Sequence, residues 1–451
     1  MTTIERDILR ARLNVELERF ADTHPRSRAL AEKAGNLLIS GVPMPWMVRW
    51  AGAFPLFVQS GAGPNFVDVD GHRYIDFCLG DTGAMSGHAP GATVRAVEKQ
   101  AIRGLTFMLP NEDAIWVADE LRRRFGLPAW QFTLSATDAN RAVIRLARQL
   151  TGRSKILVFN WCYHGTVDET LAVLDNGAVK PRPGNIGPPV DPALTTRVVE
   201  WNDAAALEAE LAHGDVACVL AEPAMTNIGI IPAEAGFHAA LRQLTRRSGT
   251  LLVLDETHTI SAGPGGLTRA EGLEPDFLTI GKAIGGGVPG AAYGCTAELA
   301  ARLAASLNVL EADTGGIGGT LAANALSLAA MRATLGSELS NESFGETIPM
   351  AARWTAGIRG VIAKFGLPWC VQRLGCRAEY WFRPSSPRNG GEAAQSVDPE
   401  LERYMHLAAL NRGVLLTPFH NMALIAPGVS VNDIDRHTAA FHESVAALVG
   451  S

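Results

Sequence analysis

Long apolar runs are missing from this sequence. The Ala/Gly-rich run from Gly285 to Leu310 is broken by Glu298 and Arg302, and a membrane-spanning helix needs about 20 predominantly apolar residues. The N-terminus places Glu5, Arg6 and Asp7 among its apolar residues, unlike the apolar core of a secretory signal. We therefore expect no membrane partner and a cytoplasmic location.

The sequence also has few cysteines and no excess of positive charge. The six cysteines are scattered without C-x-x-C spacing, so neither a disulfide framework nor a zinc site is indicated, and no metal is expected. Lys and Arg number 40 against 46 Asp and Glu, a net charge of -6. A nucleic-acid-binding surface is usually basic, so we expect no nucleic-acid partner.

What the chain does contain is a large apolar fraction, 47% of 451 residues, arranged as short β-branched runs between longer helical stretches. The runs are Lys155–Phe159, Val216–Ala221, Leu251–Leu254 and Phe277–Ile280. This alternation is typical of an α/β protein with a mostly parallel sheet between helices. We expect an N-terminal helix and strand segment (1–75), a large domain (76–330) and a smaller α+β C-terminal domain (331–451).

The predicted strands end in chemically distinctive residues. Asp255 follows one strand, Lys282 and three glycines follow another, and Tyr163 and Glu222 follow two more. Ligands of open α/β sheets bind at the carboxyl ends of the strands. Desolvation lowers the pKa of a lysine and makes its amine a nucleophile. Taken singly, Lys282 could equally cap a strand at the surface and Asp255 could be an ordinary strand-end acid. Together they match a site for pyridoxal phosphate, which needs a lysine and a buried carboxylate.

Over roughly residues 40 to 440 the sequence resembles the class III, fold type I pyridoxal-phosphate aminotransferases, within the branch similar to glutamate-1-semialdehyde aminomutase. The matching motifs are Asp70-Gly71, Gly87-His88, Ser135 to Ala139, Tyr163-His164-Gly165, Glu222-Pro223 with Asn227, Asp255-Glu256, Thr279 to Lys282, and Gly319-Thr320 with Asn324. The resemblance implies a fold type I transferase with a large cofactor domain and a small C-terminal domain.

The resemblance also implies roles for individual residues. Lys282 would form a Schiff base with the cofactor and carry protons, Asp255 would pair with the pyridine nitrogen, and Tyr163 would stack on the ring. Asn227 would lie near the ring oxygen, and Ser135, Ala136 and Thr137 would hold the phosphate at a helix N-terminus. Thr320 would reach the same phosphate from the neighbouring subunit, so a homodimer is expected.

Three positions depart from the family pattern. Ala136 replaces a usual glycine, which requires a negative φ there. Thr257 replaces a usual valine that packs on the ring, so its hydroxyl needs a partner. Met422 lies where the aminomutase has a glutamate. For the substrate, Trp46 lies where a carboxylate-binding arginine is usual, and Arg49 could either bind that carboxylate or be a solvated surface residue.

The favoured function is an aminotransferase that moves an amino group between an amine or amino acid and a keto acid or ketone. The alternative is an aminomutase or racemase of a small amino acid, which uses the same residues but needs no external acceptor. A non-catalytic protein of the same fold ranks last, because it predicts loss of Lys282 or Asp255 and both are present.

Overall fold

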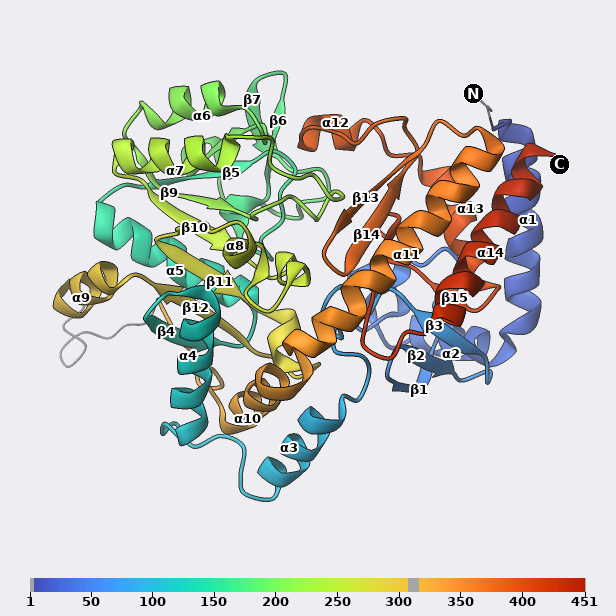
Figure 1. Cartoon of the computed structure of the whole chain (residues 1–451), viewed down its shortest axis with the longest axis horizontal. Helices are drawn as coiled ribbons and strands as arrows, with labels where there is room; N and C mark the ends of the chain where they lie inside the picture. The colour runs from blue at the N-terminus through green and yellow to red at the C-terminus, as the bar shows by residue number, and fades with distance from the viewer. Residues whose placement is uncertain (1–3, 307–315, 451) are drawn as a thin grey trace. The chain divides into compact units, whose positions relative to one another are not determined.

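The structure is a computed structural model that describes residues 4–306 and 316–450. The chain forms two compact units (Figure 1). The central unit comprises Gly91–Asn341 and Pro387–Gln395, and the terminal unit comprises Met1–Pro90, Glu342–Ser386 and Ser396–Ser451. The N-terminal segment therefore belongs with the C-terminal part of the chain. Among the described residues, no helix combines the length and the apolar character that crossing a membrane demands.

The central unit contains a seven-stranded sheet in the order β4-β12-β11-β10-β9-β5-β8. Its strands are β4 (Ala129–Thr133), β5 (Lys155–Phe159), β8 (Thr196–Val199), β9 (Val216–Ala221), β10 (Leu251–Asp255), β11 (Phe277–Ile280) and β12 (Ala291–Cys295). The strands β5, β8, β9, β10 and β11 pair in parallel, and β12 pairs antiparallel with both of its neighbours. The expected mostly parallel sheet is confirmed.

Helix α5 (Ala136–Thr151) forms much of the core beneath this sheet. Ser135 caps its first turn by accepting a hydrogen bond from the backbone of Asp138, and Gly152 ends it in the left-handed conformation. Its apolar residues recur at helical spacing, and Ala139, Val143 and Ala147 are fully buried. Burying this face fixes the N-terminus of α5.

Other elements of the central unit surround the sheet or connect its strands (Figure 1). The helices are α3 (Gly91–Ala101), α4 (Glu112–Phe125), α6 (Ala204–Leu211), α7 (Phe237–Ser248), α8 (Gly266–Ala270), α9 (Ala297–Ser306), α10 (Ala325–Ala333) and α12 (Gly390–Ala394). A separate hairpin is formed by β6 (Ala172–Asp175) and β7 (Ala178–Pro181).

The terminal unit combines two small sheets with long helices. One sheet, β1-β2-β3-β15, contains β1 (Val58–Ala62), β2 (Asn65–Asp68), β3 (Arg73–Asp76) and β15 (Val414–Leu415); the other, β13-β14-β16, contains β13 (Cys370–Leu374), β14 (Arg377–Trp381) and β16 (Met422–Leu424). The helices are α1 (Arg6–Thr23), α2 (Pro25–Gly35), α13 (Pro399–Leu410) and α14 (Val431–Val449). Helix α11 (Asn341–Phe365) also belongs to this unit, except for its first residue, Asn341, which is assigned to the central unit.

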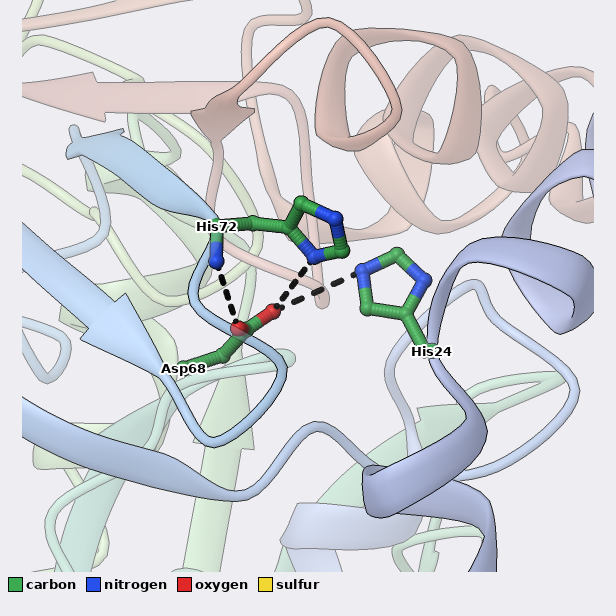
Figure 2. Close-up of side chains that lie close together, drawn as sticks. All are labelled: His24, Asp68 and His72. Carbon is green, nitrogen blue, oxygen red and sulfur yellow. Dashed lines mark hydrogen bonds and ion pairs between the residues drawn. The ribbon is translucent and has the colours of Figure 1, made fainter.

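A cluster of His24, Asp68 and His72 lies where α1 meets the β2–β3 hairpin (Figure 2). Asp68 Oδ2 lies 3.5 Å from His24 Nε2 and 3.3 Å from His72 Nδ1. Tyr74 already donates to Asp68 Oδ2 at 2.8 Å and lies 2.7 Å from His24 Nε2. Four arginines line the adjoining cavity of about 640 Å³, and their charge disfavours a cation. We interpret the cluster as a hydrogen-bonded link between helix and hairpin.

Buried histidines make the terminal unit sensitive to acid. His437 on α14 is fully buried, and its ring stacks on Trp354 with centroids 5.2 Å apart. Burial, with a smaller contribution from His406, lowers the pKa of His437 to about 3. In the unfolded chain a histidine titrates near 6.5. The unfolded state therefore binds the extra proton between these two values, and folding stability falls as the pH drops through that window.

We expect His437→Phe to remove this part of the acid sensitivity, because phenylalanine keeps the ring packing and has no titrating group. The parent should lose roughly 1–3 kcal/mol of its free energy of unfolding through this histidine when the pH falls from about 7.5 to about 4.5, and the variant should not lose that amount. Urea unfolding at both pH values measures the change. His213→Phe, at an exposed position, is the control. An unchanged pH dependence in His437→Phe would contradict the prediction.

Candidate active site

The site is built around the buried carboxylate of Asp255, at the end of β10. Its Oδ2 accepts hydrogen bonds from Asn140 Nδ2 at 3.0 Å and from His164 Nδ1 at 2.9 Å. Its Oδ1 accepts the backbone N–H of Thr257 at 3.1 Å. Asn140 also accepts a bond from the hydroxyl of Thr279 on β11 at 2.7 Å. Helix α5, the loop after β5 and the turn after β10 therefore converge on one carboxyl group.

These contacts keep Asp255 ionised. Burial opposes its charge, but the hydrogen bond and the positive charge of His164, with bonds from Thr257 and Asn140, outweigh burial and lower its pKa to about 2. For His164, burial likewise opposes the charge, whereas Cys162 and the bond to Asp255 raise the pKa to about 10. A fixed buried anion of this kind can hold a proton on a nitrogen placed against its Oδ1.

Lys282 follows β11 in a strained conformation. Its φ is +48°, in the left-handed region, and such a non-glycine residue costs on the order of 1–3 kcal/mol. A Cβ placed on the preceding Gly281 would lie 3.1 Å from the Ala136 backbone nitrogen. The missing side chain at Gly281 therefore allows the lysine's backbone to approach the N-terminus of α5.

The lysine side chain contacts a histidine that the sequence did not identify as functional. Lys282 Nζ lies 2.6 Å from Nε2 of His258. His258 Nδ1 lies 3.0 Å from the hydroxyl of Thr226, and that hydroxyl contacts the buried carboxyl group of Glu222. The only sequence signal for His258 is its place three residues after Asp255.

The first turn of α5 has the features expected of a phosphate site. Ser135 caps the helix, and the backbone N–H groups of Ala136 and Thr137 lie in the first turn, where a helix leaves them without intrahelical partners. The φ of Ala136 is negative, as a residue with a methyl side chain requires at this position. Thr137 Oγ1 accepts the backbone N–H of Thr166 at 3.1 Å, which joins this turn to the loop after Tyr163.

The donor set fits pyridoxal phosphate. The hydroxyl of Thr257 is buried beside Asp255, and no well-formed hydrogen bond to it is found among the described residues, so it is available to a bound group. A buried anion, a lysine amine and a helix N-terminus with free N–H groups are the kinds of group that the ring nitrogen, the aldehyde and the phosphate each require.

Three further predicted cofactor residues lie in the same unit. Tyr163 is half-buried beside His164, and Asn227 is half-buried directly after Thr226. Thr320 is exposed. Their predicted contacts with the ring and the phosphate stay predictions.

The predicted substrate residues lie in the terminal unit. Trp46 and Arg49 gather around Phe419, with ring centroids 5.5 Å apart for Trp46 and the guanidinium 5.5 Å from the ring centre for Arg49. Met422 is fully buried on β16, where its sulfur accepts a bond from Thr417 at 3.9 Å. Arg49 is exposed, and its role as a carboxylate ligand stays a prediction.

Gly281→Ala tests the close approach at the lysine. The added methyl would press on Ala136 and Ala291 at 3.1 Å, so we expect a loss of about 1–3 kcal/mol in the free energy of unfolding. Gly285→Ala is the matched control, because the nearest atom to a Cβ there is 3.8 Å away. Denaturant unfolding measures both. Equal stability in the two variants would contradict the packing argument.

Known proteins resemble the chain over almost its whole length. A glutamate-1-semialdehyde 2,1-aminomutase from Sorangium cellulosum is 36% identical over 435 residues, covering 95% of this chain and 98% of its own. The structure of a glutamate-1-semialdehyde aminomutase from Pseudomonas aeruginosa PAO1 has a TM-score of 0.97 and 48% identity over 99% of each chain, and a lysine-to-alanine variant of it was solved in complex with PMP. A β-phenylalanine aminotransferase from Variovorax paradoxus has a TM-score of 0.85 and 28% identity, covering 97% of each chain.

The class III aminotransferase family matches residues 46–354, more than half of the chain. The fold, the cofactor site and these similarities agree with one another. The chain belongs to the class III aminotransferase family, and its cofactor is pyridoxal phosphate on a type I fold.

Proposed function

We propose that this enzyme is an aminomutase, which moves an amino group between neighbouring carbons of one substrate, and that glutamate-1-semialdehyde is the first compound to test. The observation that carries this proposal is the similarity to an aminomutase structure, at 48% identity over 99% of each chain. From the sequence, transamination is the main expectation and an aminomutase the alternative; the similarities favour the alternative.

When bound, pyridoxal phosphate supplies an aldehyde that condenses with amines and a ring that withdraws electrons from the adjacent carbon. Asp255, ionised and fixed by His164 and Asn140, holds a proton at the ring nitrogen. The first turn of α5, from Ser135 to Thr137, binds the phosphate. Lys282 provides the amine and moves protons at Nζ. The half-buried Tyr163 and Asn227, with the Thr257 hydroxyl, orient the ring.

Two parts of the proposal concern molecules outside this chain. We place Thr320, exposed in the single chain, against the phosphate of a second subunit, so that the enzyme works as a homodimer. We place the substrate carboxylate near Arg49, whose guanidinium suits bidentate binding of a carboxylate. A location inside the cell is part of the same proposal.

Transamination is the second candidate, because Met422 offers no acid where the aminomutase has a glutamate. It is also supported by the similarity to a β-phenylalanine aminotransferase. A transaminase of this kind would pair an amine or amino acid with a keto acid.

Dependence on a second substrate separates the two candidates. We expect purified holoenzyme to convert glutamate-1-semialdehyde to its amino-shifted isomer without any added amino acceptor, because both carbons belong to one molecule. Product is followed by chromatography with and without a keto acid. Turnover only in the presence of the keto acid would contradict the aminomutase and favour the transaminase.

Lys282→Ala tests the nucleophile. We expect the variant to fold and to bind the cofactor through the phosphate and Asp255 contacts, but to form no bond that borohydride can trap. Its turnover should fall by roughly 10³-fold or more, since both the nucleophile and the proton carrier are lost. Mass spectrometry after borohydride treatment, with the parent enzyme as the control, measures the bond. Trapping at another lysine would contradict the assignment.

A further inference from the structure

A hydrogen-bonded line of side chains connects the active-site lysine to a buried acid. Nζ of Lys282 lies 2.6 Å from Nε2 of His258, and Nδ1 of His258 lies 3.0 Å from the Thr226 hydroxyl. That hydroxyl contacts Oε2 of Glu222, and the backbone N–H of Thr226 donates to Oε1 at 3.1 Å. Glu222, Thr226 and His258 are all buried. The proposed function uses Lys282 alone as the proton carrier, so the other three residues need an explanation.

Counting donors and acceptors gives two proton arrangements along this line. With Glu222 ionised, it accepts the O–H of Thr226, the Thr226 oxygen accepts Nδ1–H of His258, and Nε2 accepts a proton from charged Lys282. With Glu222 protonated, each bond reverses, and Nε2–H donates to neutral Lys282. One proton crosses each bond between the two arrangements. The net change is the transfer of one proton from Nζ to the carboxyl group, with the total charge unchanged.

We propose that Glu222, Thr226 and His258 form a proton relay that receives the proton carried by Lys282, stores it on the carboxyl group and returns it. The relay rests on the proposed function, in which Lys282 carries the substrate's proton. The three residues act through the lysine and are positioning residues. The relay serves one chemical step, in which Nζ of Lys282 gains and loses a proton.

The electrostatics of Glu222 suit a store of this kind. Burial raises its pKa to about 7, against the opposing influences of His164 and the bonds from Thr226, and nearby Asp255 raises it further. The carboxyl group can therefore gain or lose a proton near neutral pH at small free-energy cost. The titratable groups around the relay are Lys282 and His258 at one end, with His164 and Asp255 beside the acid.

A histidine with a purely structural role would behave differently. It would hold the turn after β10, and its removal would lower stability without changing the proton affinity of the lysine nitrogen. The relay instead supplies an acceptor for the proton on Nζ of the free lysine, and it would do the same for that nitrogen when the cofactor is bound. Breaking the line at any point should therefore lower the pKa of that nitrogen.

Thr226→Val is the sharpest test, because valine matches the shape of threonine and removes only the hydroxyl. The measurement is a spectrophotometric pH titration of the holoenzyme without substrate, which reports the protonation of the nitrogen that joins Lys282 to the cofactor. We expect Thr226→Val and His258→Leu each to lower that pKa by about one unit or more, a tenfold loss of proton affinity. Thr245→Val is the matched control: its buried hydroxyl bonds Leu241 O on α7 at 2.9 Å, outside the line, and we expect no shift.

An unshifted titration in Thr226→Val that retains its cofactor would overturn the relay. So would a shift confined to His258→Leu, because the line would then end at the histidine. If His258→Leu does not fold, Thr226→Val decides alone. Failure of the acceptor-free turnover assay, with the titration shifted as expected, would overturn the aminomutase and leave the relay standing.

Discussion

The ionised carboxylate of Asp255 is the interaction on which the rest of the site depends. Burying a charge is costly unless hydrogen bonds replace the lost water. Here the donors are Asn140 on α5, His164 in the loop after β5 and the backbone of Thr257. They come from three separate segments, so the carboxylate holds those segments together. The same segments carry the first turn of α5, Tyr163 and the turn that bears His258.

The backbone at Lys282 shows how the fold supports a strained functional residue. A left-handed lysine is unfavourable by itself, yet Gly281 lets the chain pass close to Ala136, and β11 is buried over its whole length. The sheet and α5 bury enough apolar surface to offset this local cost. A rigid position matters because a proton can pass from Nζ to Nε2 of His258 only while the two atoms stay within hydrogen-bond distance.

Sequence patterns predicted the parts of the fold that depend on local composition. The bounds of β5, β9 and β11 agree with the predicted apolar runs. The strand β12 was missed because Ala291–Cys295 is rich in small residues, and its place is set by antiparallel pairing with β4 and β11. The C-terminal strand β15 pairs in parallel with β3 through Val414 and Ile75, and this pairing depends on contacts far apart in the sequence.

The residues of the candidate site also fall into two groups, those that the local sequence predicts and those that depend on the tertiary structure. Asp255 and Lys282 could be found because each follows an apolar strand at the edge where ligands bind. Asn140, Thr226 and His258 could not, because hydrogen bonds between distant segments depend on the orientation of side chains. Nothing in a single sequence shows that the turn after β10 directs an imidazole at the lysine.

A buried proton store also bears on how protons move at the active site. In an aminomutase and in a transaminase alike, the lysine takes a proton from one atom and delivers one to another, and a proton from water serves as well as the original one. A line from Lys282 to Glu222, closed to solvent by the burial of its last three members, keeps that proton within the protein. The relay therefore serves either reaction, and the choice between aminomutase and transaminase depends on whether the enzyme needs an external amino acceptor.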